Sequence, residues 1–173
     1  LFSSDENMNE VFELFVYKFY EYELPKGYTV KYQSQLNWNL TGGNQSLLPI
    51  MKMDTLIKSE KETTIIDTKY YKNYVSTNFN KASFISENIY QMMAYLGNIN
   101  ANNDLRGILL YPLPFDSEPI DETYDVKIAS DGPDVKIQFL TIDLSQDWKK
   151  IAFDLLSIID INLANKKAQE IAS

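Results

Sequence analysis

The chain has 173 residues, no cysteine, no histidine and a formal net charge of −8 at pH 7. Without cysteine or histidine it can build no disulfide, no ordinary zinc site and no Ser-His-Asp or Cys-His nucleophile, which leaves carboxylate, lysine and Mg²⁺-type chemistry. The acidic balance argues against strong unaided binding to DNA, because neutralising phosphates supplies most of the non-specific affinity for DNA.

Residues 5–23 have the period of an amphipathic helix, which the sequence PKG at 25–27 then ends. Its predicted core stripe has apolar residues at i, i+3 and i+4 spacing: Met8, Val11, Phe12, Phe15, Val16 and Phe19. Glu13 lies roughly 60° from Val16, near the edge of this stripe. Its carboxylate could lean toward a neighbouring site or stay on a solvated face, and the helix pattern leaves both open.

Residues 28–33 and 35–40 alternate with period two and predict two short strands before a turn at Gly42 and Gly43. Their aromatic residues could stack on bases, although packing on a sheet face is the more frequent use of such residues.

Residues 50–57 and 63–71 are apolar-rich runs on either side of a polar tetrapeptide, and this pattern predicts a β-hairpin. Asp54 interrupts the first run and Asp67 the second. Side chains on a strand alternate faces, so Asp67 and Lys69 share a side, and pairing of the two runs brings Asp54 beside Asp67. Two carboxylates and one ammonium would suit a Mg²⁺-type site. The spacing fits an exposed Asp67–Lys69 ion pair equally well.

The rest of the chain predicts further helices and strands. In chain order they are a polar loop over 73–86, a helix over 87–98, a buried strand over 105–110, a peripheral hairpin over 124–129 and 135–142, and one or two helices over 145–171. Gln91 and Tyr95 lie one turn apart on one face of the expected helix. These elements predict an α/β fold, a mixed sheet between helices, and one domain over residues 1–173.

Several strings resemble the catalytic domain of McrC-type subunits, nucleases of the PD-(D/E)xK superfamily from modified-cytosine-dependent restriction systems. They are MKMD at 51–54, IIDTKYYK at 65–72, YQMMAY at 90–95 and LLYP at 109–112. IIDTKYYK is the most specific of them, and the resemblance extends over about residues 9–143, most of the chain. One position departs from the motif: Met53 stands where proline is usual, a difference that affects backbone shape more than chemistry.

The resemblance implies a restriction-endonuclease-like core that carries a Mg²⁺-dependent DNA endonuclease, with Mn²⁺ as a substitute. Asp54 and Asp67 would bind one or two metals. Glu13 would join them, because it resembles a glutamate that such nucleases often place on their first helix. Lys69 would position the attacking water or offset charge on the phosphate, and Gln91 would help orient the site.

The resemblance also implies partners, namely DNA and a GTP-driven AAA+ motor subunit of the McrB type. No nucleotide-binding motif is present in the 173 residues, so we expect the motor to be a separate protein. Four lysines in the locally positive segment 52–81 are predicted to contact DNA: Lys58, Lys61, Lys72 and Lys81. Tyr95 joins them, because nucleases of the RecB type use such a Gln–Tyr pair to hold the site and the DNA. The alternative is a non-catalytic DNA-binding or assembly module that retains the fold.

We expect a cytoplasmic, bacterial protein that does not enter a membrane. No apolar run reaches the ~18–20 residues of a membrane span, and no signal peptide is evident. The lack of cysteine suits a reducing compartment. The chain begins at Leu1, so we expect it to be the C-terminal catalytic part of a longer protein.

Overall fold

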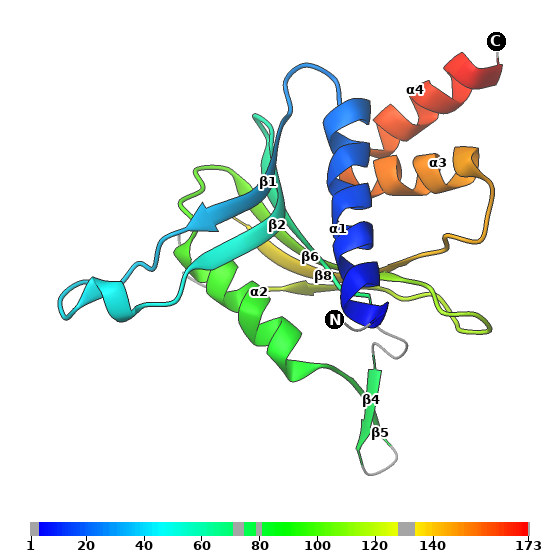
Figure 1. The fold of residues 1–173 in the computed structure, drawn as a ribbon. Helices are drawn as coiled ribbons and strands as arrows, with labels where there is room; N and C mark the ends of the chain where they lie inside the picture. Colours follow the sequence, from blue (N-terminus) through cyan, green and yellow to red (C-terminus); the bar gives the residue numbers. More distant parts are fainter. Residues whose placement is uncertain (1–3, 71–74, 79–80, 128–133, 173) are drawn as a thin grey trace.

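The computed structural model describes residues 4–70, 75–78, 81–127 and 134–172, and its centre is a six-stranded sheet (Figure 1). From edge to edge the strands are β1 (Thr29–Leu36), β2 (Met51–Lys58), β3 (Glu62–Thr68), β6 (Asp104–Pro112), β8 (Val135–Ile142) and β7 (Asp121–Asp125). β3, β6 and β8 are parallel, whereas β1, β2 and β7 pair antiparallel with their neighbours. The predicted α/β fold with a mixed sheet is therefore confirmed, and it is consistent with a restriction-endonuclease-like core.

Helices cover both faces of this sheet. α1 (Ser4–Glu23), α3 (Trp148–Ile159) and α4 (Ile161–Ala172) lie on one face, and α2 (Ser86–Asn98) lies on the other (Figure 1). Ile66 packs in the core on the α1 side, and its neighbour Ile65 packs in the core on the α2 side; both are fully buried. This alternation follows from the pleat of a central strand that is covered on both faces.

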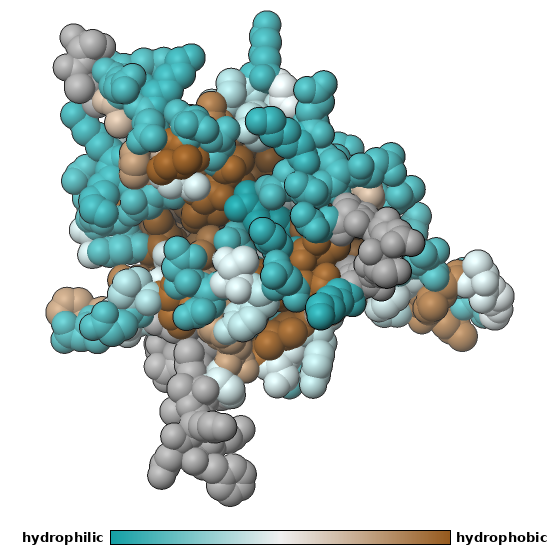
Figure 2. Space-filling model, turned by 180° about the vertical axis from the view of Figure 1, so that it is seen from behind, coloured by the Kyte–Doolittle hydropathy of each residue, from teal (hydrophilic) through white to brown (hydrophobic). Residues whose placement is uncertain are grey.

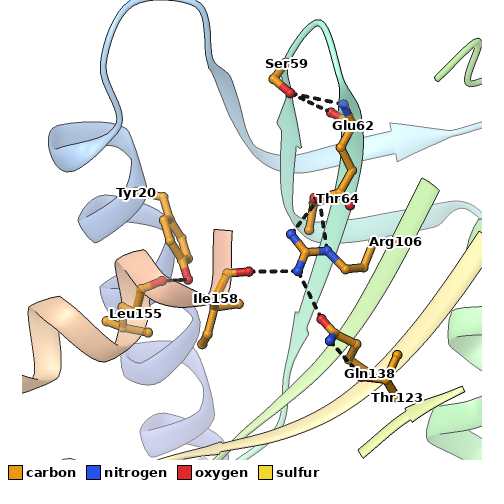
Figure 3. Close-up of polar contacts among 9 residues, drawn as sticks. All are labelled: Tyr20, Ser59, Glu62, Thr64, Arg106, Thr123, Gln138, Leu155 and Ile158. Atoms are coloured by element: carbon orange, nitrogen blue, oxygen red, sulfur yellow. Dashed lines mark hydrogen bonds and ion pairs between the residues drawn. The ribbon is translucent and has the colours of Figure 1, made fainter. Parts of the chain in front are cut away.

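Two local features fix the helices to the sheet. Tyr20 on α1 donates a hydrogen bond of 2.8 Å from its hydroxyl to the Leu155 carbonyl on α3 (Figure 3). On the other face α2 packs so closely on β6 that a Cβ atom at Gly107 would overlap Met92 Sδ. Among the described residues, no helix combines the length and the apolar character needed to cross a membrane.

Arg106 joins four elements near the beginning of β3 and β6 (Figure 3). Its Nε and Nη2 atoms donate to Glu62 Oε2 on β3 at 3.0 and 2.6 Å. Its Nη1 atom donates to Gln138 Oε1 on β8 at 3.1 Å and to the Ile158 carbonyl on α3 at 2.8 Å. One side chain thus ties three strands and a helix together at this end of the sheet.

Three expectations about local structure are corrected. The two strands predicted over 28–33 and 35–40 are one strand, β1, which ends at Leu36 and has an unusual backbone at Gln33. Within the predicted loop over 73–86, β4 (Val75–Asn78) and β5 (Lys81–Phe84) form a two-stranded ribbon, too short for its period to stand out in the sequence. Met8 and Val11 of the predicted stripe remain 41% and 58% exposed, because α1 rests on the sheet along the line of Phe12 and Val16.

The segment 37–50 between β1 and β2 contains the short helix η1 (Gln45–Leu47) and projects from the sheet (cyan in Figure 1). Leu47 and Ile50 are 80% and 73% exposed, and hydrophobic atoms cover part of this projection at the right of Figure 2. Trp38 Nε1 donates to the Pro49 carbonyl at 2.6 Å and closes the base of the segment.

Candidate active site

Asp54 and Asp67 come together where the β2–β3 hairpin opens. The last pair of the ladder is Thr55 with Ile66, and the two aspartates follow it directly, one on each strand. Asp54 Oδ2 accepts hydrogen bonds from the Thr68 backbone nitrogen at 2.9 Å and from Thr68 Oγ1 at 3.1 Å. The Asp54 carboxylate therefore takes the place of a backbone partner for β3, beside Asp67.

Burial and mutual repulsion shift the acidity of both groups. Burial, then the charges of Asp67 and Glu13, raise the pKa of Asp54 to about 7. Burial also raises the pKa of Asp67, against the opposing effect of the Lys69 ammonium. Asp67 is fully buried, and its Oδ1 atom has no hydrogen-bond partner among the described residues. A buried carboxylate oxygen without a partner is unfavourable unless a cation or a donor occupies the space beside it.

Lys69 lies on the same side as Asp67, as strand alternation predicts. Its Nζ atom is 2.8 Å from Asp67 Oδ2, and its side chain is 15% exposed. Its backbone nitrogen donates to the Leu110 carbonyl at 3.0 Å, so the chain continues along β6 past the end of β3. The lysine thus places one positive charge at the rim of an acidic site.

Glu13 reaches the same site from α1. It is 8% exposed, and its Oε1 atom accepts a hydrogen bond of 3.0 Å from Gln33 Nε2 on β1. Its charge contributes to the raised pKa of both Asp54 and Asp67. Of the two orientations that the helix pattern left open, the structure has the one that faces the aspartates.

Tyr95 and Gln91 approach from α2 on the other face of the sheet. Gln91 Nε2 donates to the Tyr95 hydroxyl at 2.8 Å, and this hydroxyl donates to the Lys52 carbonyl at 2.7 Å. Burial, then the charge of Asp67, raises the pKa of Tyr95, with smaller contributions from Asp54 and Glu13. Tyr95 is 3% exposed and its hydroxyl is bonded to Gln91 and to the Lys52 carbonyl, so this structure shows it as a packed residue, and its contact with DNA stays a prediction.

Two comparisons with known proteins bear on this site. A family model described as "McrBC 5-methylcytosine restriction system component" matches residues 6–112, a range that contains all the groups described above. The chain belongs to this McrBC family. It is also 30% identical over 162 residues to the "Type IV methyl-directed restriction enzyme EcoKMcrBC" of Escherichia coli (strain K12). That match covers 91% of the chain and 44% of the relative, so the chain spans less than half the length of this curated protein.

The comparisons confirm the resemblance to McrC-type subunits. The family match ends at residue 112, at the end of β6, whereas the similarity to the Escherichia coli protein extends over most of the chain.

The lysines predicted to contact DNA do not gather at the carboxylates of this McrBC-family chain. Lys58 and Lys61 are exposed at the turn of the β2–β3 hairpin. Lys61 is six residues, or about 20 Å, from Asp67, and Lys58 pairs with Thr63, which is four residues, or about 13 Å, from Asp67 along β3. Lys72 lies outside the described residues. Lys81 begins β5, and its side chain is also outside them. Lys52 is exposed on β2, two residues from Asp54, and is the better-placed cation on this strand.

Sequence reasoning missed two groups that hold the acidic residues. Thr68 supplies both hydrogen bonds to Asp54, and Gln33 supplies the one to Glu13. Thr68 lies between Asp67 and Lys69 in the sequence, but a threonine at this position is not by itself a sign of a hydrogen bond to Asp54. Gln33 stands at an ordinary polar position of a period-two pattern, so nothing in the sequence marks it as a donor to Glu13.

The donor set fits a hard cation with few protein ligands. Among the described residues, no group of three or more acidic side chains is arranged to hold a metal ion unaided. Asp54 and Asp67 offer two carboxylates, and Asp67 Oδ1 has no hydrogen-bond partner among the described residues. Mg²⁺ commonly takes one or two carboxylates and completes its shell with waters and substrate phosphate oxygens. The chemistry of these residues therefore suits Mg²⁺.

Proposed function

We propose that this McrBC-family chain is a Mg²⁺-dependent DNA endonuclease of the PD-(D/E)xK type and the cleaving subunit of a modification-dependent restriction complex. The observation that carries the proposal is the Asp54–Asp67 pair, with a lysine 2.8 Å from one carboxylate and, on the same group, a buried oxygen without a hydrogen-bond partner among the described residues. An acidic pair with one fully buried and one partly buried member, both with raised pKa values, in a site reached from three elements is typical of functional residues.

Asp54 and Asp67 would hold the metal, with Glu13 as a further acidic neighbour and Mn²⁺ as an alternative ion. When bound, such a cation polarises the scissile phosphate and lowers the pKa of an attacking water. The chain would provide a site in which both aspartates are already oriented, Asp54 by its two hydrogen bonds from Thr68.

The remaining residues would act on the water and the phosphate. Lys69 would position the attacking water, or offset the negative charge that develops on the phosphate, from its place beside Asp67. Gln91 would act through Tyr95, because its amide donates to the hydroxyl that is bonded to the Lys52 carbonyl. These hydrogen bonds would keep α2 and β2 in a fixed relative position beside Asp54.

From the net charge of the chain we infer that the partner subunit, and not this chain, provides most of the DNA binding. At −8 the chain itself should bind DNA weakly, because it offers few cations to phosphates. A GTP-driven AAA+ partner of the McrB type would bring methylated DNA to the carboxylates. Methyl-directed restriction is what the description of the Escherichia coli relative states of that protein.

The test is DNA cleavage by the full-length protein assembled with its motor partner. Methylated plasmid is incubated with GTP and Mg²⁺, Mn²⁺ or EDTA, and nicked and linear products are measured. The parent and Asp121→Asn, an exposed carboxylate on β7, should cleave in a metal-dependent manner, whereas Asp67→Ala should not. Metal-independent DNA binding without cleavage by any assembly would instead support the non-catalytic binding or assembly module.

A further inference from the structure

Strand β1 changes its face beside the carboxylates. Val30 packs in the core on the α1 side, and Leu36, an even number of residues later, packs in the core on the α2 side. The neighbouring strand β2 does the same, since Ile57 packs on the α1 side and Met53 on the α2 side. Regular alternation would place each pair on one face, so both strands reverse next to Asp54.

The reversal in β1 has a backbone cause at Gln33. Among the described non-glycine residues, only Gln33 and Asp116 have positive φ, and Gln33, at 44°, is the one within a strand. It lies between the pairs Tyr32–Thr55 and Ser34–Met53, and so directly across from Asp54. Such a backbone is unfavourable for a residue with a side chain and is found most often where a site needs it.

The left-handed backbone brings two consecutive side chains of β1 to one carboxylate. Gln33 Nε2 donates to Glu13 Oε1 at 3.0 Å and lies 3.4 Å from the Tyr32 hydroxyl. Burial, then the charge of Glu13, raises the pKa of this tyrosine. On a regular strand, the side chains of consecutive residues point to opposite faces. The approach of both Tyr32 and Gln33 to Glu13 therefore depends on the backbone conformation of Gln33.

An amide is a suitable donor for this position. It fixes an oxygen of Glu13 without adding a positive charge, so the carboxylate keeps its full attraction for a cation. Gln33 itself is exposed, and it therefore reaches the buried Glu13 from the solvent side of the site.

We propose that Gln33 is a positioning residue of the acidic site, which holds the Glu13 carboxylate toward Asp54 and Asp67 by means of its strained backbone and its side-chain amide. This inference rests on the proposed metal-dependent nuclease function. In it, β1 orients a carboxylate beside the cation that the aspartates would hold. Loss of such a supporting hydrogen bond typically weakens metal affinity or activity about 10–100-fold.

The test separates the backbone of Gln33 from its amide. Gln33→Gly accepts the left-handed backbone without strain but removes the hydrogen bond. In the full-length protein it should weaken Mn²⁺ binding about tenfold, measured by calorimetry, and should leave the melting temperature unchanged or higher. Gln35→Gly, on the same strand and exposed, is the matched control. It should keep the Mn²⁺ affinity and lower the melting temperature, because glycine in a regular strand is unfavourable.

A double-mutant cycle identifies Glu13 as the group through which Gln33 acts. In a Glu13→Gln background, adding Gln33→Gly should change Mn²⁺ affinity by less than about twofold, since the partner carboxylate is already gone. The inference is overturned if Gln33→Gly binds Mn²⁺ like the parent, or if its effect is undiminished in the Glu13→Gln background. If the parent neither binds Mn²⁺ nor cleaves DNA, the nuclease proposal fails and this inference fails with it.

Discussion

Strand β3 has an acid–base pair at each end, and the two pairs differ in how completely their hydrogen-bonding capacity is used. At the beginning of the strand, Glu62 Oε2 accepts from Nε and Nη2 of Arg106 and from Thr64 Oγ1, all within 3.0 Å (Figure 3). At the far end, Asp67 has an ion pair with Lys69 and one oxygen without a hydrogen-bond partner among the described residues.

The difference separates a structural pair from a functional one. A fully connected polar network fixes strands and helices to one another, and the network of Arg106 extends through Gln138 to Thr123 on β7. A buried acid with unused capacity is instead available to a ligand. Hollows of about 460 and 610 Å³ both border Arg106, so a hollow beside a charged pair does not by itself mark the functional end.

Replacing the carboxylate at each end of β3 by the corresponding amide should have its largest effect on DNA cleavage. Asp67→Asn should reduce single-turnover cleavage by the assembled complex about 10³-fold or more, or ~4 kcal/mol, because it removes a charge that would hold the metal. Glu62→Gln should cleave within about twofold of the parent at a temperature where both are folded. A folded Asp67→Asn protein that cleaves at the parental rate would falsify the assignment of Asp67 to the site.

Stability should respond in the opposite order. Glu62→Gln should lower the free energy of unfolding by about 1–3 kcal/mol, because the largely buried Arg106 loses its charged partner. The figure is below that of a fully buried pair, since the Glu62 side chain is 31% exposed. Asp67→Asn should be as stable as the parent or more so. Urea unfolding of the metal-free proteins measures both, and a stable Glu62→Gln beside an unstable Asp67→Asn would reverse the roles of the two ends.

The hairpin and its acidic pair could be predicted from local sequence pattern, because alternation along each apolar run determines which side chains share a face of the sheet. Asp67 and Lys69 needed only strand alternation, and Asp54 needed only pairing of the two runs. The orientation of Glu13 could not be settled in this way. It depends on which sheet face α1 covers and on where the hairpin opens, and both are decided by contacts distant in sequence.

Two local patterns in the sequence look different once the fold is known. The sequence predicts two strands over 28–33 and 35–40, whereas residues 29–36 form one strand with a left-handed residue, Gln33, within it. The local positive excess was real along the sequence. A strand spreads neighbouring residues over length, however, so Lys58 and Lys61 lie at the hairpin turn and away from Asp67.

The acidic end should make the metal-free protein less stable as pH rises. The folded-state pKa of Asp54, about 7, exceeds its ordinary value of 3.8, mainly through burial and then through the charges of Asp67 and Glu13. Its contribution to stability is therefore fully present below pH 4 and is lost as pH rises toward 7. Asp54→Asn removes this loss and should be more stable than the parent at pH 8 by roughly 1–3 kcal/mol, with little difference near pH 4.

Urea unfolding in EDTA at pH 4 and pH 8 measures this effect. Asp121→Asn, an exposed carboxylate on β7, is the matched control and should follow the parent at both pH values. Equal pH dependence of Asp54→Asn and the parent would show that Asp54 is ionised in the folded protein without penalty, contrary to its burial and its acidic neighbours.

The smallest expected effect is the stabilisation of the folded protein by Mg²⁺, and it tests whether the unused capacity at Asp67 receives a cation. Mg²⁺ at about 10 times its Kd should stabilise the fold by about 1.4 kcal/mol, or a shift of roughly 3–6 °C in melting temperature. Asp54→Asn should reduce the shift, because one of the two carboxylates is neutral, whereas Glu62→Gln should retain it from a lower starting temperature. Differential scanning calorimetry with Mg²⁺, and with Na⁺ at equal ionic strength, separates binding from general screening of the acidic chain. A shift of the same size in Asp54→Asn and in the parent would place the ion elsewhere, and the contrast between the two ends of β3 would then lose its functional meaning.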